Sequence, residues 1–120
     1  MKIVINRCFG GFGLSEKAFE MLLDRKGIRF EKEESEYKSL GIMNYYHFGH
    51  LGDDEYYISH YDSYSDRSDP HLVAIVEELG EEANSRYAEL KVVEIPDDVA
   101  WHICEYDGIE HVAEDHRTWE

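Results

Sequence analysis

The first third of the chain changes from a strand pattern to a helix pattern across one loop. Residues 3–5 form a continuous apolar run, which is typical of a strand buried on both faces, and we expect a strand over residues 2–7. After a loop rich in glycine and phenylalanine, apolar residues recur at helical spacing over residues 15–26. Ser15 is the expected N-cap of this helix, and Gly27 the expected residue just beyond its end.

The middle of the chain is less regular. Residues 28–38 are charged and weakly periodic, which predicts a short edge strand or a loop. Residues 42–48 and 55–61 are rich in tyrosine and isoleucine, and the glycine-containing segment 49–53 separates them. This pattern predicts a β-hairpin.

The second half contains a helix followed by strands. Asp69 is the expected N-cap of a second helix, with Pro70 at its first position and Gly80 at its end, and residues 81–87 add a helical turn. Apolar residues then indicate three strands, over residues 90–95, 101–106 and 109–114. Asp107 and Gly108, between the last two, favour a type I′ hairpin turn.

Together these elements predict a single α+β domain over residues 1–120. We expect a mixed sheet of about five to six strands, with antiparallel hairpins and two main helices. No stretch approaches the roughly 20 apolar residues of a membrane helix, and the N-terminal pattern does not favour a signal peptide.

Charge narrows the class of partner. The 120 residues carry a net charge of −15, distributed as +2 over residues 1–27, −4 over 28–61 and −13 over 62–120. Such an acidic chain repels nucleic acid and anionic lipid, so we expect neither as a direct partner. The carboxylates suit a basic protein surface or imitate nucleic acid, or they simply form a solvated exterior.

The two cysteines indicate the redox environment. Cys8 and Cys104 are too few for a disulfide framework, which fits a reducing cytoplasm, and a single bridge between them stays open. Cys8 precedes the first helix, where the helix dipole activates a thiol, but a buried inert cysteine is the commoner case.

The glycine loop is the main candidate site. Its glycines allow close approach of a ligand to the backbone, its phenylalanines are placed to stack on a flat ring, and the following helix N-terminus attracts anions. Its spacing matches neither a Walker A loop nor a dinucleotide fingerprint. The alternative is a tight turn whose phenylalanines belong to the core. The predicted ligand-binding residues are Arg7, Cys8, Phe9, Gly10, Gly11, Phe12, Gly13, Ser15, Lys17 and Arg67.

Two further groups of residues carry weaker hypotheses. Strand alternation places His102, Cys104 and His111 on one face of the last hairpin, where three ligands suit zinc, although a solvated polar face is the commoner outcome. An enzyme would use this metal site or Cys8, but we favour a binding protein without a cofactor. The tyrosines and histidines of residues 45–64 predict an interface with a foreign protein or a second copy of the chain.

Both ends of the sequence resemble a known group of proteins. The matching segments are residues 5–15 (INRCFGGFGLS), 90–97, 106–108 and 116–119 (HRTW). They are similar to a family of small bacteriophage- and prophage-encoded proteins of uncharacterised activity. The resemblance implies a protein of the infected bacterium's cytoplasm and supplies no catalytic residue.

These observations lead to a ranked set of functions. We first expect a non-enzymatic phage accessory protein that binds a small anionic, nucleotide-like ligand at the glycine loop and counters host defence. The alternative is an acidic inhibitor, or nucleic-acid mimic, that occupies a nucleic-acid-binding protein of the host. The third is a small cysteine- or metal-dependent enzyme.

Overall fold

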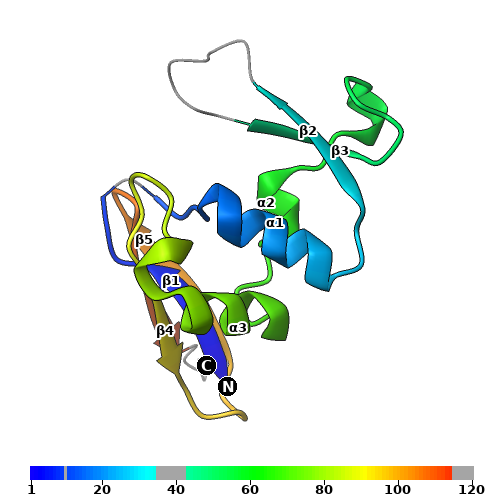
Figure 1. Ribbon diagram of the computed structural model, residues 1–120. Coiled ribbons are helices and arrows are strands. Elements are labelled where there is room, and N and C mark those ends of the chain that lie inside the picture. Colours follow the sequence, from blue (N-terminus) through cyan, green and yellow to red (C-terminus); the bar gives the residue numbers. More distant parts are fainter. Residues whose placement is uncertain (10, 35–42, 115–120) are drawn as a thin grey trace, which may run out of the picture.

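Strand β1 (Lys2–Asn6) is almost entirely buried in the computed structural model, which describes residues 1–9, 11–34 and 43–114 (Figure 1). After exposed Lys2, its four following residues are all buried, as the apolar run predicted. β1 pairs antiparallel with β4 (Leu90–Glu94), with Lys2 opposite Glu94. The strands predicted over residues 2–7 and 90–95 therefore lie side by side.

The remaining strands form two more antiparallel pairs. β2 (Phe30–Glu34) pairs with β3 (Met43–His47), and β5 (Trp101–Tyr106) pairs with β6 (Ile109–Glu114). The α+β class and the antiparallel hairpins are confirmed. The described residues form three separate two-stranded sheets rather than one mixed sheet, because side chains and a loop occupy the second edge of β1.

Two main helices are present as predicted. In α1 (Glu16–Arg25), the Ser15 side chain accepts a hydrogen bond from the amide of Ala18. In α3 (Pro70–Leu79), the Asp69 side chain caps the first turn, and Gly80 ends the helix with φ +57°. The short η3 (Gly80–Ala83) follows α3 directly and overlaps the segment 81–87, which was expected to add a helical turn.

The predicted hairpin of residues 42–48 and 55–61 is reduced to a single antiparallel bridge, between Tyr46 and Tyr57, and the ladder expected there does not form. β3 pairs with β2 instead, and the later segment contains η2 (Asp54–Tyr56) and α2 (His60–Ser63). Asp53 and Ser59 cap these two turns by accepting hydrogen bonds from nearby amides, so local side-chain bonding replaces a strand ladder. Ile42 and residues 35–38 lie outside the described residues.

Helix α1 separates two groups of buried side chains. Its Ala18 and Leu22 face one group, and its Phe19 and Leu23 face the other. The aliphatic cluster consists of Val4, Ala18, Leu22, Leu72, Val73, Ile75, Val76 and Ala83. The aromatic cluster consists of Phe19, Leu23, Tyr45 and Ile58, with the rings of Phe30 and His60 against it.

The molecule is elongated as a result. Its extents are 53 × 32 × 28 Å, and its radius of gyration is 15.9 Å, against roughly 14 Å for a compact domain of this length. Figure 1 shows the β2–β3 pair on one side of α1, with β1, β4 and α3 on the other. Within the described ranges, none of the helices has the length and apolar character needed to span a bilayer.

Candidate functional site

Backbone pairing closes the helix side of the glycine loop. The amide of Ser15 donates to the carbonyl of Ala83 (2.8 Å), and the carbonyl of Gly13 accepts from the amide of Ser85 (3.1 Å). A Cβ atom on Gly13 would stand 2.5 Å from the Ser85 hydroxyl. A side chain at Gly13 would therefore require the Ser85 hydroxyl to move.

The strand side of the loop packs on the turn of the last hairpin. Gly108 has φ +90°, and a Cβ atom there would lie 2.6 Å from the Gly11 nitrogen and 2.8 Å from the Phe9 carbonyl oxygen. Only glycine fits this position, because both the backbone angle and the space exclude a side chain. Gly10 lies outside the described residues.

A buried polar cluster of Asn6, Arg67 and Glu110 joins these segments. The Arg67 guanidinium pairs with the Glu110 carboxylate (2.6 Å), and their side chains are only 15% and 7% exposed. The same carboxylate accepts from the backbone amide of Asn6 (2.8 Å). The side-chain nitrogen of Asn6 donates to the carbonyls of Cys8 and Gly108, both at 2.7 Å. Each buried polar group thereby has a partner.

This cluster changes the role expected for Arg67. Its carbonyl accepts from the amide of Val4 (2.9 Å), so residue 67 covers the β1 edge that faces away from β4. Its guanidinium lies 3.6 Å from the centre of the Phe12 ring, which also contacts the Tyr64 ring at 5.0 Å. The expectation that Arg67 faces a ligand is corrected, because a carboxylate and a ring already occupy it. Phe12 packs inward, whereas Phe9 is 69% exposed.

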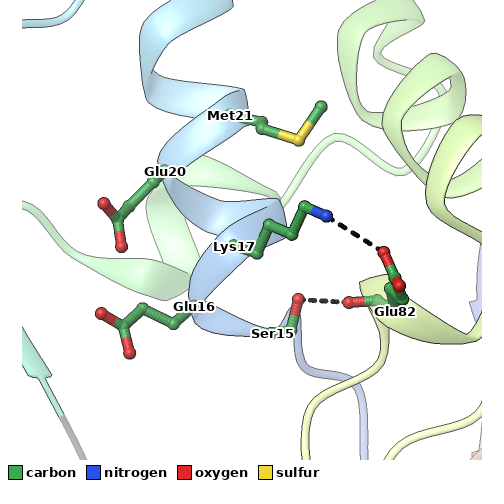
Figure 2. Close-up of a pocket in the computed structure, with 6 residues that line it drawn as sticks. All are labelled: Ser15, Glu16, Lys17, Glu20, Met21 and Glu82. Atoms are coloured by element: carbon green, nitrogen blue, oxygen red, sulfur yellow. Dashed lines mark hydrogen bonds and ion pairs between the residues drawn. The ribbon is translucent and has the colours of Figure 1, made fainter.

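A hollow beside the N-terminus of α1 is lined by Glu16, Glu20 and Glu82 together with Lys17. Its volume is about 790 Å³. Figure 2 shows Lys17 facing Glu82 across this hollow, with Glu16 and Glu20 turned to the other side of the helix. Lys17 pairs with the Glu82 carboxylate at 3.0 Å, and the Ser15 hydroxyl donates to the Glu82 carbonyl at 2.6 Å. The lysine and hydroxyl expected to meet an anion thus meet η3 instead.

The carboxylates of α1 bind β2. Lys32 contacts both Glu16 (2.5 Å) and Glu20 (2.9 Å). The hydrogen bond from Lys32 lowers the pKa of Glu16, and the hydrogen bonds to both carboxylates raise the pKa of Lys32. Tyr45 donates to Glu20 (3.2 Å), and burial, together with these neighbouring carboxylates, raises its pKa.

Folding neutralises the cationic segment of residues 1–27. Among its basic residues, Arg7 has no carboxylate partner within the described ranges, and its guanidinium donates to the carbonyl of Glu110 (2.9 Å). The others pair with carboxylates from the acidic segment 62–120. These ion pairs are Lys2–Glu77, Lys17–Glu82, Arg25–Glu78 and Lys26–Asp69.

The last hairpin has the predicted register but no metal-binding group. Cys104 lies opposite His111, and its sulfur is 3.2 Å from Nε2 of His102. Within the described part of the chain, no three histidine, cysteine or acidic side chains are arranged to hold a metal. Cys8 and Cys104 are both free thiols, so the bridge left open by the sequence is not formed.

The tyrosine-rich segment exposes apolar groups. Arg29 lies 4.2 Å from the centre of the Phe48 ring, and His50 stacks on Tyr56 at 3.6 Å. The exposed large apolar residues of this segment are Phe48, Leu51, Tyr56 and Tyr57. His60 differs because it lies against Phe19 (4.0 Å), where burial lowers its pKa. An interface at the exposed rings stays a prediction.

Asn6 and Glu110 are the structurally central polar residues that sequence reasoning missed. Their contact spans 104 positions in the chain. Glu110 is the second residue of the strand predicted over residues 109–114, and Asn6 is the last residue of the buried strand β1. A polar residue closing an apolar strand is a weak signal, and nothing local indicates its partner.

Comparisons with protein-family models, with curated proteins and with solved structures found no match to this chain. Its function is therefore argued from its own surface.

Proposed function

We propose that this protein is a non-enzymatic acidic binder that docks on the basic, nucleic-acid-binding surface of a partner protein. The observation that carries the proposal is the internal pairing of the N-terminal cations. Because Lys2, Lys17, Arg25 and Lys26 pair with carboxylates of the same chain, they do not offset the remaining carboxylates, and the chain keeps its net charge of −15. Such a field attracts cationic partners and accelerates their association.

One end of the molecule supplies the carboxylates for this contact. They are exposed on and between the strands β4, β5 and β6, and none of them forms an ion pair with a described lysine or arginine. We call them the C-terminal carboxylates: Glu94, Asp98, Glu105, Asp107 and Glu114. Together they give this part of the surface an excess of exposed negative charge, which suits a surface that neutralises phosphates.

The resemblance of both chain ends to phage-encoded proteins supports a bacterial host protein as the partner. In this role the protein needs no catalytic group. It competes with nucleic acid for a basic surface, and its affinity falls as salt screens the carboxylates.

The test is a competition experiment with a panel of purified basic nucleic-acid-binding proteins of a bacterial host. The protein is expected to displace labelled DNA from at least one of them. Displacement should weaken as salt rises from about 0.05 M to about 0.3 M, because the Debye length shortens. Failure to displace DNA from any member at low salt would overturn the proposal.

A pair of charge-matched variants separates location from net charge. Glu94→Lys/Asp98→Lys/Glu114→Lys alters the C-terminal carboxylates and is expected to weaken displacement by at least about tenfold, or about 1.4 kcal/mol. The control carries the same number of charge reversals on other exposed carboxylates: Asp24→Lys, Glu55→Lys and Asp62→Lys. Equal losses in both variants would contradict a contact at the C-terminal carboxylates.

A small anionic ligand is the second candidate, and Arg7 is the observation that favours it. Arg7 is exposed beside exposed Phe9 and lacks a carboxylate partner among the described residues. Titration calorimetry with a nucleotide panel is expected to give binding that Arg7→Ala abolishes. Phe9→Leu, which keeps the charge, is the matched control. Absence of heat with every nucleotide, or equal binding by Arg7→Ala, would exclude this candidate.

A further inference from the structure

The backbone of β2 has one edge directed away from β3. The amide of Phe48 donates to the carbonyl of Arg29 (3.1 Å), so these two residues form a hydrogen-bonded pair next to the ladder. Antiparallel pairs alternate, and therefore Glu31 directs its backbone groups toward β3 while Phe30 and Lys32 direct theirs outward.

The opposite side of the sheet confirms this alternation. Tyr45 lies across from Lys32, and its carbonyl accepts from the amide of Ile58 (2.8 Å) on the far side of β3. Because the Tyr45 carbonyl points toward Ile58, it cannot also point toward β2. Lys32 therefore also directs its amide and carbonyl outward.

Described residues form no backbone hydrogen bond to this outer edge at Phe30 or Lys32. Within the described ranges, no hydrogen bond involves the outward amide or carbonyl of Phe30 or Lys32, and Lys32 and Glu33 are exposed. A two-stranded sheet is a marginal unit, and an open edge is a template for a further strand. Figure 1 shows the β2–β3 pair standing beyond α1, away from the other strands.

Charge selects what this edge accepts. Lys32 is the one cation of β2, and its ammonium is neutralised by Glu16 and Glu20 of α1. A second copy of β2, paired antiparallel about Lys32, would set Glu31 opposite Glu33, and like charges directly opposite destabilise a sheet. The edge therefore rejects its own copy and favours a cationic strand.

We propose that the outer edge of β2 accepts an extended, lysine- or arginine-rich segment of the partner protein as a third strand. Phe30 and Lys32 supply the main-chain hydrogen bonds. Glu31 and Glu33 share one face by alternation. One oxygen of Glu31 accepts from the Gly49 amide (3.2 Å), and the other oxygen, with the exposed Glu33 carboxylate, contacts alternate basic side chains of the segment. The inference rests on the proposed function, since it specifies how a basic partner is held at a second place.

The experiment uses a synthetic nonapeptide in which lysine alternates with valine. A peptide with glutamate in place of lysine is the charge control. Titration calorimetry is expected to show salt-sensitive binding of the lysine peptide alone. Amide hydrogen exchange is expected to show new protection at Phe30 and Lys32. No binding of the lysine peptide, or protection elsewhere only, would overturn the inference.

Two variants of one residue isolate the backbone contribution. Lys32→Pro removes the outward amide, at an edge position where proline is tolerated. Lys32→Thr removes the same ammonium but keeps the amide. Proline is expected to weaken peptide binding at least about tenfold relative to threonine, or about 1.4 kcal/mol. Equal binding would refute strand addition, and circular dichroism of both variants checks that the fold is kept.

A third variant tests the charge term. Glu31→Gln/Glu33→Gln keeps the shape of both side chains and is expected to lower both affinity for the lysine peptide and its salt dependence. Unchanged affinity would contradict the pairing with basic side chains.

The proposed function has a separate outcome, because displacement of DNA from intact basic proteins depends on the C-terminal carboxylates. If Lys32→Pro still displaces DNA and still binds the lysine peptide, strand addition at β2 is refuted but the proposed function is not. If the protein binds the peptide but displaces no DNA, the proposed function is refuted.

Discussion

The two sides of α1 are stabilised in different ways. On the β1 side, aliphatic residues pack around α3, and the polar cluster satisfies the second edge of β1 with Arg67 and Glu110. On the β2 side, rings of Phe19, Tyr45 and His60 pack edge to face, and the outer edge of β2 has no described partner. The difference teaches that the first side closes its strand edge with its own chain, whereas the second leaves a strand edge that its described residues do not pair.

The largest effect is expected from breaking the polar cluster. Glu110→Ala leaves the Arg67 guanidinium and the Asn6 amide without their acceptor in a buried place. The free energy of unfolding is expected to fall by about 3–5 kcal/mol, the usual loss when one partner of a buried pair is removed. Chemical denaturation measures it.

Two variants support this measurement. Glu114→Ala, on the exposed part of the same strand, is expected to change stability by less than about 0.5 kcal/mol. Glu110→Gln keeps an acceptor for Asn6 and should recover part of the loss, which covers the case of an alanine variant that does not fold. A loss in Glu110→Ala no larger than in Glu114→Ala would show that the cluster does not hold the hairpin.

A smaller effect is expected from the aromatic cluster. Phe19→Leu removes the ring contacts with Tyr45 and His60 but keeps an apolar side chain, and should cost about 1–3 kcal/mol. Hydrogen exchange is expected to accelerate at β2 and β3 more than at β1 and β4. Phe9→Leu, at an exposed ring, is the control. Equal acceleration on both sides of α1 would mean that the two sides open as one unit.

The aromatic cluster is also expected to respond to pH through His60. Burial lowers the pKa of His60 below its ordinary value of 6.5, so the unfolded chain takes up the proton first. The stability contributed by neutral His60 is therefore present above about pH 6.5 and falls as pH decreases toward the folded-state pKa. Near-ultraviolet circular dichroism of denaturation at several pH values follows this change. His60→Phe should make stability less dependent on pH in this range. An unchanged pH dependence would mean that another group is responsible for it.

The smallest effect is expected from the ion pairs that join α1 to β2. Lys32→Thr removes the contacts with Glu16 and Glu20, which are partly exposed, and should cost under about 1 kcal/mol. The same substitution should raise the pKa of Glu16, because the hydrogen bond from Lys32 lowers it in the native protein. NMR titration of Glu16 checks this shift, and an unchanged value would show that Lys32 does not stabilise its charged form.

Local signals in the sequence were sufficient for the two main helices, α1 and α3, and for the last hairpin. Ser15, Asp69 and the Asp107–Gly108 turn act on neighbouring backbone groups, so their effects are visible in the sequence. The pairing of β3 was mispredicted because the tyrosine-rich segment after it offers strand-forming residues, while caps at Asp53 and Ser59 shape it into turns. Partner choice between strands is a property of the whole fold.

The candidate site was predictable only in part. The excess of carboxylates is a property of composition, and it survives folding on the exterior. The cationic character of the glycine loop does not survive, because Lys17 and Arg67 meet Glu82 and Glu110 from distant segments. Ion pairs of this kind depend on which surfaces approach in space, and sequence spacing does not indicate them.

The position of β1 also bears on the order of events during synthesis. β1 is translated before the residues that fill its two edges, which are Arg67, β4 and Glu110. Its apolar residues must wait for most of the chain, whereas α1, β2 and β3 are complete by residue 47. The pairing of β1 is therefore expected to form after α1, β2 and β3 have been translated.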